Sequence, residues 1–176
     1  SRVGARLGIL GLGRIGHAVA KRAEAFGLEI AYHGRRRQDG VAYAYHDSPA
    51  ALAEACDILL VATPGGGETR HIVDARLLKA LGPSGYLVNI GRGSAVDEAA
   101  LVAALEAGTI AGAGLDVYED EPRVHPGLIP LQNAVLLPHL ASGSVPTRTA
   151  MGQAMFDNLD AWFETGKPLT PIAELS

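Results

Sequence analysis

The stretch that decides the fold lies near the N-terminus, where residues 7–16 read LGILGLGRIG. Residues 7–10 suit a short buried strand, and the glycines that follow match the pattern G-x-G-x-x-G. Gly11 permits a tight turn, Gly13 lets the backbone approach a diphosphate, and Gly16 lets a helix pack closely on the strand. Because the pattern directly follows a predicted strand, it predicts a dinucleotide-binding turn.

A helix is expected directly after this turn, at residues 14–26. Its apolar residues include Ile15, Val19 and Phe26, which lie at helical spacing. The first turn of such a helix presents free N–H groups and a partial positive charge to a diphosphate. Arg14 is expected to add a charge-assisted contact to the phosphates.

Six short apolar runs recur along the chain, and most are bounded by Gly, Pro or Asp. They are residues 7–10, 28–32, 58–62, 86–90, 113–117 and 134–137. Runs this short suit strands that are buried on both faces. Segments with helical spacing lie between them, and residues 97–107 begin with acidic residues, as helices often do. The alternation predicts an α/β fold, a doubly wound parallel Rossmann sheet of about six main strands.

A long C-terminal helix is predicted at about residues 145–165, with Gly166 and Pro168 ending it. One stripe of this helix is apolar and carries Met151, Met155, Leu159 and Trp162. We expect the stripe to face the core of the domain. The alternative is that it docks onto another domain or subunit.

The composition indicates a single domain over residues 1–176, because 48% of the residues are hydrophobic and the length suits one core. A net charge of -4 gives no global basic surface, so we expect a small-molecule substrate and neither a nucleic-acid nor a membrane partner. Cys56 is the only cysteine and is expected to be buried. The sequence thus indicates no disulfide, no metal site and a cytoplasmic location.

A basic loop follows the second apolar run, where residues 33–37 read HGRRR. A site for NAD usually offers a carboxylate about 20 residues past the glycines, to bind the ribose 2′-hydroxyl. A guanidinium pairs instead with a 2′-phosphate, so the loop favours NADP(H), with NAD(H) possible. Gly34, Arg35 and Arg36 are the expected contacts, rather than Arg37. The alternative is a solvated basic loop.

Three polar residues follow the last three apolar runs: Arg92, Glu121 and His139. Ligands of an open α/β sheet bind outside the carboxyl ends of its strands. An arginine grips a substrate carboxylate, a histidine moves a proton near neutral pH, and a carboxylate holds the second nitrogen of the histidine. Together these residues suit hydride transfer to a 2-keto acid, although each alone has an ordinary structural explanation.

These residues resemble the D-isomer-specific 2-hydroxyacid dehydrogenases, and the resemblance covers nearly the whole chain. Besides the glycine turn, the similar segments are 61–64 (VATP), 68–71 (ETRH), 89–93 (NIGRG), 112–122 and 137–139 (LPH). An accidental match to the glycine turn would not carry these segments together in order.

The resemblance implies a role for each predicted site residue. Arg92 would bind the substrate carboxylate and carbonyl, and His139 would be the acid/base. Glu121 would hydrogen-bond His139 and raise its pKa by favouring the charged form. Asp116 would lie near the nicotinamide ring. The other residues expected at the cofactor are Ile15, Thr63, Pro64, Thr69, Ile90, Gly91 and Ser142. Family members commonly dimerise through this domain, so a homodimer is expected.

Residues 64–67 (PGGG) and the basic loop look most like the glyoxylate and hydroxypyruvate reductase branch. D-lactate- or phosphoglycerate-type dehydrogenases, and a nucleotide-sensing module like the corepressors that resemble this family, remain alternatives. A hydroxyisobutyrate-type dehydrogenase fits the segment 89–93 poorly. The substrate domain that precedes the Rossmann domain in this family looks absent, so we expect this chain to bind cofactor with little or no activity of its own.

Overall fold

The computed structural model describes residues 4–171. It divides the chain into two compact units, which meet in sequence between Pro138 and His139.

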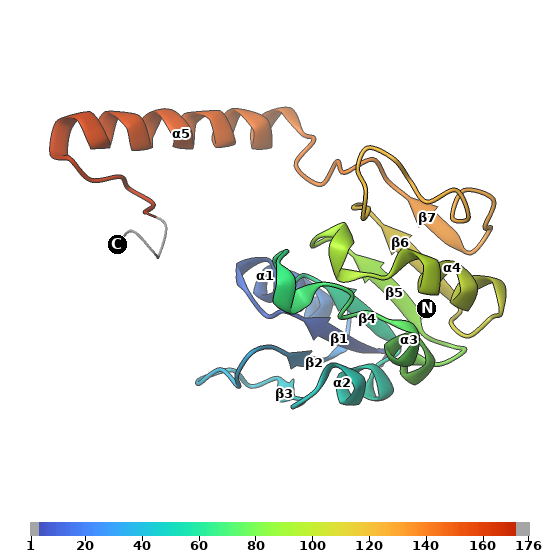
Figure 1. Ribbon diagram of the computed structural model, residues 1–176. Coiled ribbons are helices and arrows are strands. Elements are labelled where there is room, and N and C mark those ends of the chain that lie inside the picture. Colours follow the sequence, from blue (N-terminus) through green and yellow to red (C-terminus); the bar gives the residue numbers. More distant parts are fainter. Residues whose placement is uncertain (1–3, 172–176) are drawn as a thin grey trace. The chain divides into compact units, whose positions relative to one another are not determined.

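The first unit is built on one sheet of seven strands, in the order β3-β2-β1-β4-β5-β6-β7 (Figure 1). All neighbouring strands are parallel. The strands are β1 Arg6–Leu10, β2 Glu29–His33, β3 Ala44–Tyr45, β4 Ile58–Val61, β5 Tyr86–Asn89, β6 Gly112–Leu115 and β7 Ala134–Leu136. The predicted parallel Rossmann sheet is confirmed. Each of the six predicted runs overlaps a strand whose bounds differ from those of the run by at most two residues, and β3 is an addition.

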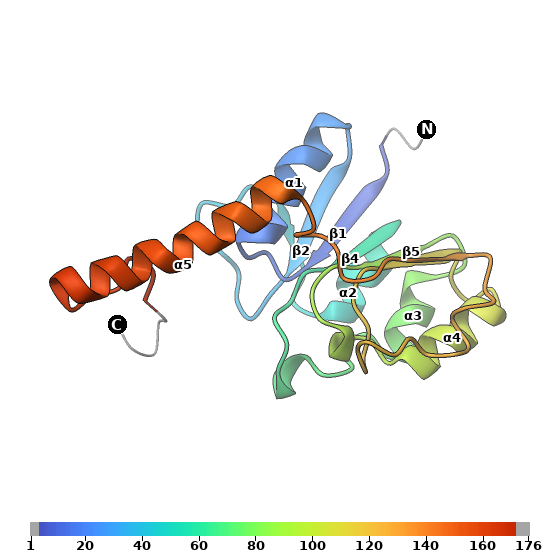
Figure 2. The same ribbon diagram turned by 90° about the horizontal axis from the view of Figure 1, so that it is seen from above.

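Helices lie on both faces of this sheet, as Figure 2 shows from above. They are α1 Arg14–Ala25, α2 Pro49–Ala55, α3 Ala75–Leu81 and α4 Glu98–Glu106, with the 3-10 turns η1 Gly67–Thr69 and η2 Gly93–Ala95. The helix predicted at 14–26 is therefore correct to one residue. The one predicted at 97–107 begins one residue later, because the side chain of Asp97 caps it by accepting from the N–H of Ala100.

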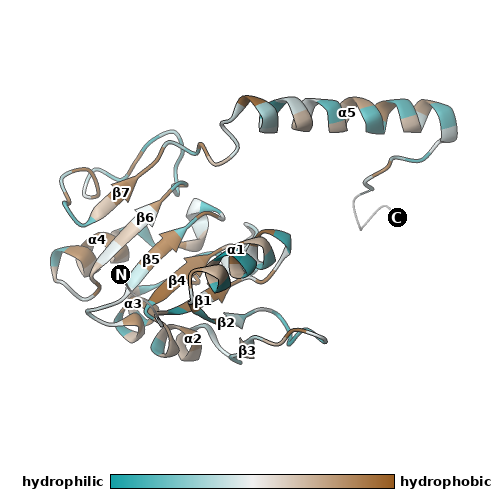
Figure 3. Cartoon of the chain, turned by 180° about the vertical axis from the view of Figure 1, so that it is seen from behind, coloured by the Kyte–Doolittle hydropathy of each residue, from teal (hydrophilic) through white to brown (hydrophobic). Residues whose placement is uncertain are grey.

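Alternation along β1 divides the core into two layers. Ile9 packs with Ala20 of α1 and Tyr32 of β2, whereas Leu10 belongs to the larger cluster beneath α2, α3 and α4, which includes Cys56. Figure 3 shows the central strands as strongly hydrophobic. Cys56 is buried as expected, and burial raises the pKa of its thiol to about 11.

The strand order places a topological switch point beside β1. The chain runs from β1 outward to β2 and β3, then returns to β4 on the other side of β1. The loops that follow β1 and β4 therefore lead in opposite directions. In open α/β sheets, ligands bind between two such loops, at the carboxyl ends of the strands. The glycine turn occupies this position, because it directly follows β1.

The second unit contains α5, Val145–Thr165, at the predicted bounds. Ser144 caps its start, and Gly166 ends it with a left-handed φ of 70°. The prediction that the apolar stripe of α5 faces the core is wrong. Within this unit the helix buries none of its residues, since a single helix has no second layer to pack on; Met151, Met155, Leu159 and Trp162 are all exposed. No helix within residues 4–171 is both long and apolar enough to span a bilayer.

Candidate active site

The glycine turn packs closely on its neighbours at Gly11 and Gly16 and stays open at Gly13. Gly11 has a φ of +98°, and a Cβ there would lie 3.0 Å from the backbone of Ala62 and Thr63. A Cβ on Gly16 would lie 2.5 Å from the carbonyl oxygen of Gly11, so only glycine lets α1 approach the turn this closely. Gly13 has no other heavy atom within 4 Å of that position, so its face stays open for a ligand.

The loop after β4 presents an unsatisfied polar group. Thr63 is buried, and its Oγ1 has no hydrogen-bond partner among the described residues. Nearby, Thr69 donates from its hydroxyl to the carbonyl oxygen of Pro64 at 2.7 Å. Because buried hydroxyls in folded proteins are rarely left without a partner, the Thr63 hydroxyl fits a position that a bound cofactor completes.

The basic loop after β2 is anchored at its start and exposed at its centre. The hydroxyl of Tyr45 donates to the carbonyl oxygen of Gly34 at 3.4 Å, and the ring of Tyr45 stacks on His33. Arg35 and Arg36 are exposed, so their guanidinium groups are available to an anion. The loop bounds a hollow of about 820 Å³.

The turn after β5 holds Arg92 through a buried asparagine. The N–H of Gly91 donates to Oδ1 of Asn89, and Nδ2 of Asn89 donates to the carbonyl oxygen of Arg92, both at 3.1 Å. A Cβ on Gly91 would lie 2.7 Å from the carbonyl oxygen of Thr63, so this turn packs against the loop after β4. Ile90 is half-buried, while Arg92 remains exposed. Asn89 therefore fixes the backbone that presents the Arg92 guanidinium.

The segment after β6 carries Asp116 and Glu121. Asp116 is buried, and its N–H donates to the carbonyl oxygen of Asn89 at 3.0 Å, which places it beside the Arg92 turn. Glu121 is exposed, and its Oε1 accepts from the N–H of Tyr118 at 3.0 Å. The hydroxyl of Tyr118 in turn donates to the carbonyl oxygen of Leu137, and burial raises the pKa of this phenol.

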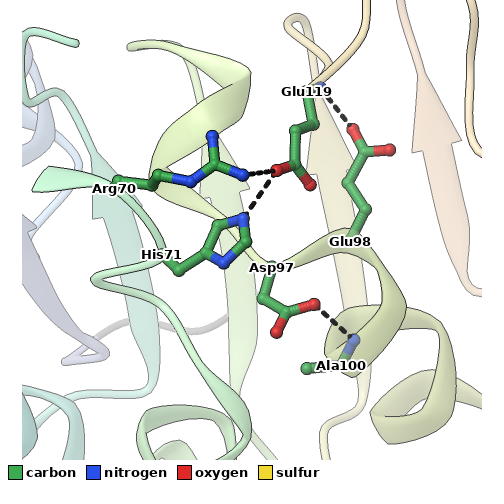
Figure 4. Close-up of polar contacts among 6 residues, drawn as sticks. All are labelled: Arg70, His71, Asp97, Glu98, Ala100 and Glu119. Atoms are coloured by element: carbon green, nitrogen blue, oxygen red, sulfur yellow. Dashed lines mark hydrogen bonds and ion pairs between the residues drawn. The ribbon is translucent and has the colours of Figure 1, made fainter. Parts of the chain in front are cut away.

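A polar network that the sequence did not reveal ties these loops together (Figure 4). Oε1 of Glu119 lies 2.6 Å from Nε2 of His71 and 2.8 Å from Nη2 of Arg70. The N–H of Glu119 donates to the buried carboxylate of Glu98 at 2.8 Å. The N–H of His71 donates to the carbonyl oxygen of Ser94. The loops after β4, β5 and β6 are therefore joined at one edge of the sheet.

The structure thus brings most of the predicted residues of the first unit to the carboxyl edge of its sheet. His139 and Ser142 belong to the second unit. His139 is exposed and has a left-handed φ of 51°. Within residues 4–171, no group of three or more His, Cys, Asp or Glu side chains is placed to hold a metal ion.

Comparison with known proteins bears on this arrangement. Residues 2–141 match the family described as D-isomer specific 2-hydroxyacid dehydrogenase, NAD binding domain. A hydroxyphenylpyruvate reductase from Plectranthus scutellarioides is 52% identical over 170 residues, which are 96% of this chain and 54% of that protein. A glyoxylate/hydroxypyruvate reductase A from Arabidopsis thaliana is 51% identical over 169 residues, with the same coverage.

A solved structure shares the fold closely. The NADPH-dependent glyoxylate/hydroxypyruvate reductase from Sinorhizobium meliloti, crystallised with NADP and malonate, superposes with a TM-score of 0.96 at 56% identity. The match covers 99% of this chain and 55% of that protein. The chain therefore spans about half the length of the relatives that it matches.

Proposed function

We propose a function from the premise that this chain belongs to the D-isomer specific 2-hydroxyacid dehydrogenase family, whose NAD-binding domain it matches. The proposed function is NADP(H)-dependent reduction of a small 2-keto acid, with glyoxylate or hydroxypyruvate as substrate. Residues 1–176 would supply the cofactor-binding domain of that enzyme, and the substrate domain of the family would lie outside them.

One observation carries the choice of cofactor: an arginine loop stands beside the glycine turn where a carboxylate would select NAD. The N–H of Gly11 donates to the carbonyl oxygen of His33 at 2.9 Å, so the turn and the start of the loop are adjacent. Arg35 and Arg36 follow and are exposed. A guanidinium pairs with a dianionic phosphate, whereas a carboxylate would repel it. The Sinorhizobium relative, named as NADPH-dependent, supports the same choice.

The residues of this chain would hold the cofactor along the carboxyl edge of the sheet. The N-terminus of α1 and Arg14 would bind the diphosphate, and Gly34, Arg35 and Arg36 the 2′-phosphate. Ile15, Thr63, Pro64, Thr69, Ile90, Gly91 and Ser142 would line the rest. When bound, the nicotinamide supplies a hydride to the keto carbon of the substrate.

The remaining roles fall to the predicted catalytic residues. Arg92, exposed on its fixed turn, would pair with the substrate carboxylate and polarise the keto oxygen. His139 would deliver the proton to that oxygen, and Glu121 would hydrogen-bond the histidine. Asp116 would lie near the nicotinamide ring.

Replacing the arginines tests the cofactor assignment. In Arg35→Ala and Arg36→Ala, NADPH affinity should fall about tenfold or more, the cost of losing a charge-assisted hydrogen bond. NADH affinity should stay within about twofold, because NADH has no 2′-phosphate. Arg148→Ala, which removes an exposed arginine of α5, is the control. An equal loss for both cofactors would contradict the assignment.

Turnover of the full-length protein tests the reaction. Glyoxylate and hydroxypyruvate should be reduced by NADPH, and Arg92→Ala should lower kcat/KM by at least about a hundredfold, since it removes the substrate's ionic partner. Hydroxyphenylpyruvate is a second candidate substrate, because a relative 52% identical carries that name. Failure to consume any 2-keto acid would instead favour a nucleotide-sensing module.

The proposal also includes a homodimer in the cytoplasm. Apolar side chains that α5 leaves exposed, such as Met155, Phe156 and Phe163, support an interface. The single buried cysteine suits a reducing compartment. Light scattering on the purified protein checks the oligomeric state.

A further inference from the structure

The basic loop is tied to the glycine turn by one side chain, Gln38. Its Nε2 donates to the carbonyl oxygen of Leu12 at 2.7 Å, and Leu12 lies between the first two glycines of the turn. Its backbone N–H donates to the hydroxyl of Tyr32 at 2.8 Å, and Tyr32 is fully buried in β2. Gln38 thus connects the end of the loop to both the glycine turn and the core.

The loop between its anchors has no such support. Arg35, Arg36 and Arg37 are consecutive and exposed. Like charges this close repel one another, so a loop held only at its start would sample open conformations. Gly34 is anchored by Tyr45, and Gln38 closes the other end. The two anchors therefore hold the arginines at a fixed distance from the glycine turn.

We infer that Gln38 is a positioning residue that determines the preference for a 2′-phosphorylated dinucleotide. This inference rests on the proposed function. NADPH must contact the glycine turn with its diphosphate and the loop with its 2′-phosphate, so its affinity depends on the distance between them. NADH has no 2′-phosphate to reach the loop, and the hydrogen bond from Gly11 to His33 holds the turn independently of Gln38.

Two substitutions remove the two bonds separately. Gln38→Met keeps the length of the side chain and removes the donor to Leu12. Tyr32→Phe keeps the buried ring and removes the acceptor of the Gln38 N–H. Gln132→Met makes the matched change at an exposed glutamine outside the loop. Calorimetric titration with NADPH and with NADH, at one salt concentration, measures the affinity of each variant.

The expected result is a loss of NADPH affinity of about fivefold for Gln38→Met and a similar loss for Tyr32→Phe, since one hydrogen bond is removed in each. NADH affinity should change by less than about twofold, and Gln132→Met should match the wild type. If Gln38→Met keeps the wild-type preference, or loses both cofactors equally, the inference is wrong. If the wild type itself shows no preference for NADPH, the proposed cofactor is wrong instead.

Discussion

Glu98 illustrates how a single buried carboxylate serves this fold. It accepts the N–H of Glu119, and burial raises its pKa even though that hydrogen bond favours the ionised form. A raised pKa in the folded state means that the folded protein binds the proton more tightly than the unfolded chain does. The contribution of Glu98 to stability is therefore largest at low pH and is lost as the pH rises from the ordinary glutamate pKa through the raised value.

The variant Glu98→Gln should lack this loss, because its amide oxygen still accepts the N–H of Glu119 but does not ionise. As the pH increases from acid to neutral, the free energy of unfolding of Glu98→Gln should rise relative to that of the wild type. Urea denaturation at several pH values measures the difference. Glu98→Ala, which leaves that N–H without an acceptor, should lose about 1–3 kcal/mol. A constant difference between wild type and Glu98→Gln across the pH range would contradict the assignment.

Single residues were predictable where local sequence defines their role. Gly11, Gly13 and Gly16 follow from a spacing within six residues, and the structure shows close backbone contacts at Gly11 and Gly16 and open space at Gly13. Glu119 and His71 lie 48 positions apart and meet only because two loops converge at the edge of the sheet. Gln38 is similar, since its partner Leu12 is 26 positions away. No spacing in the sequence signals such pairs.

At the level of elements, the 3-10 turn η2 shows why one glycine after Arg92 cannot be replaced. Gly93 packs so closely on the next loop that a Cβ there would overlap the carbonyl group of Tyr118. Gly93→Ala should destabilise the protein by about 1–3 kcal/mol through overpacking. Gly114→Ala, where nothing lies within 4 Å of the added atom, should leave stability nearly unchanged. Thermal or urea unfolding compares them, and equal stability of the two variants would rule out the close approach.

The network around Glu119 joins the loops after β4, β5 and β6, so we expect it to stabilise the packing of these loops on one another (Figure 4). Glu119→Gln should lower the free energy of unfolding by about 1 kcal/mol, because it weakens the contacts to both His71 and Arg70. The neighbouring Asp120 forms an exposed pair with Arg123, and Asp120→Asn should cost at most a few tenths of a kcal/mol, as exposed pairs do. Urea denaturation measures the free energy of unfolding of both variants. Equal losses would contradict a stabilising role of the Glu119 network.

Helices and strands were predictable where apolar residues alternate clearly with polar or turn-forming residues in the sequence. The strands stand out because most of the apolar runs are bounded by glycine, proline or aspartate. Helices α2 and α3 have seven residues each and were not predicted with bounds, since their composition is rich in alanine and leucine and gives little periodic contrast. Ser48 and Asp74, whose side chains cap these helices, were the usable signal.

At the scale of the whole molecule, the parallel sheet and its strand order explain why the candidate site lies at one edge. Every strand points its carboxyl end the same way, so the glycine turn, the basic loop and the Arg92 turn all emerge there. This much follows from alternating strands and helices. The apolar stripe of α5 was assigned to the core wrongly, because hydrophobic spacing alone does not state which surface covers it.

Titration of the wild-type chain with NADPH and with NADH at identical salt measures whether this domain selects a 2′-phosphorylated dinucleotide. NADPH should bind at least about tenfold more tightly than NADH, a difference of about 1.4 kcal/mol. Equal or tighter binding of NADH would contradict it, and would leave the three arginines as a solvated loop.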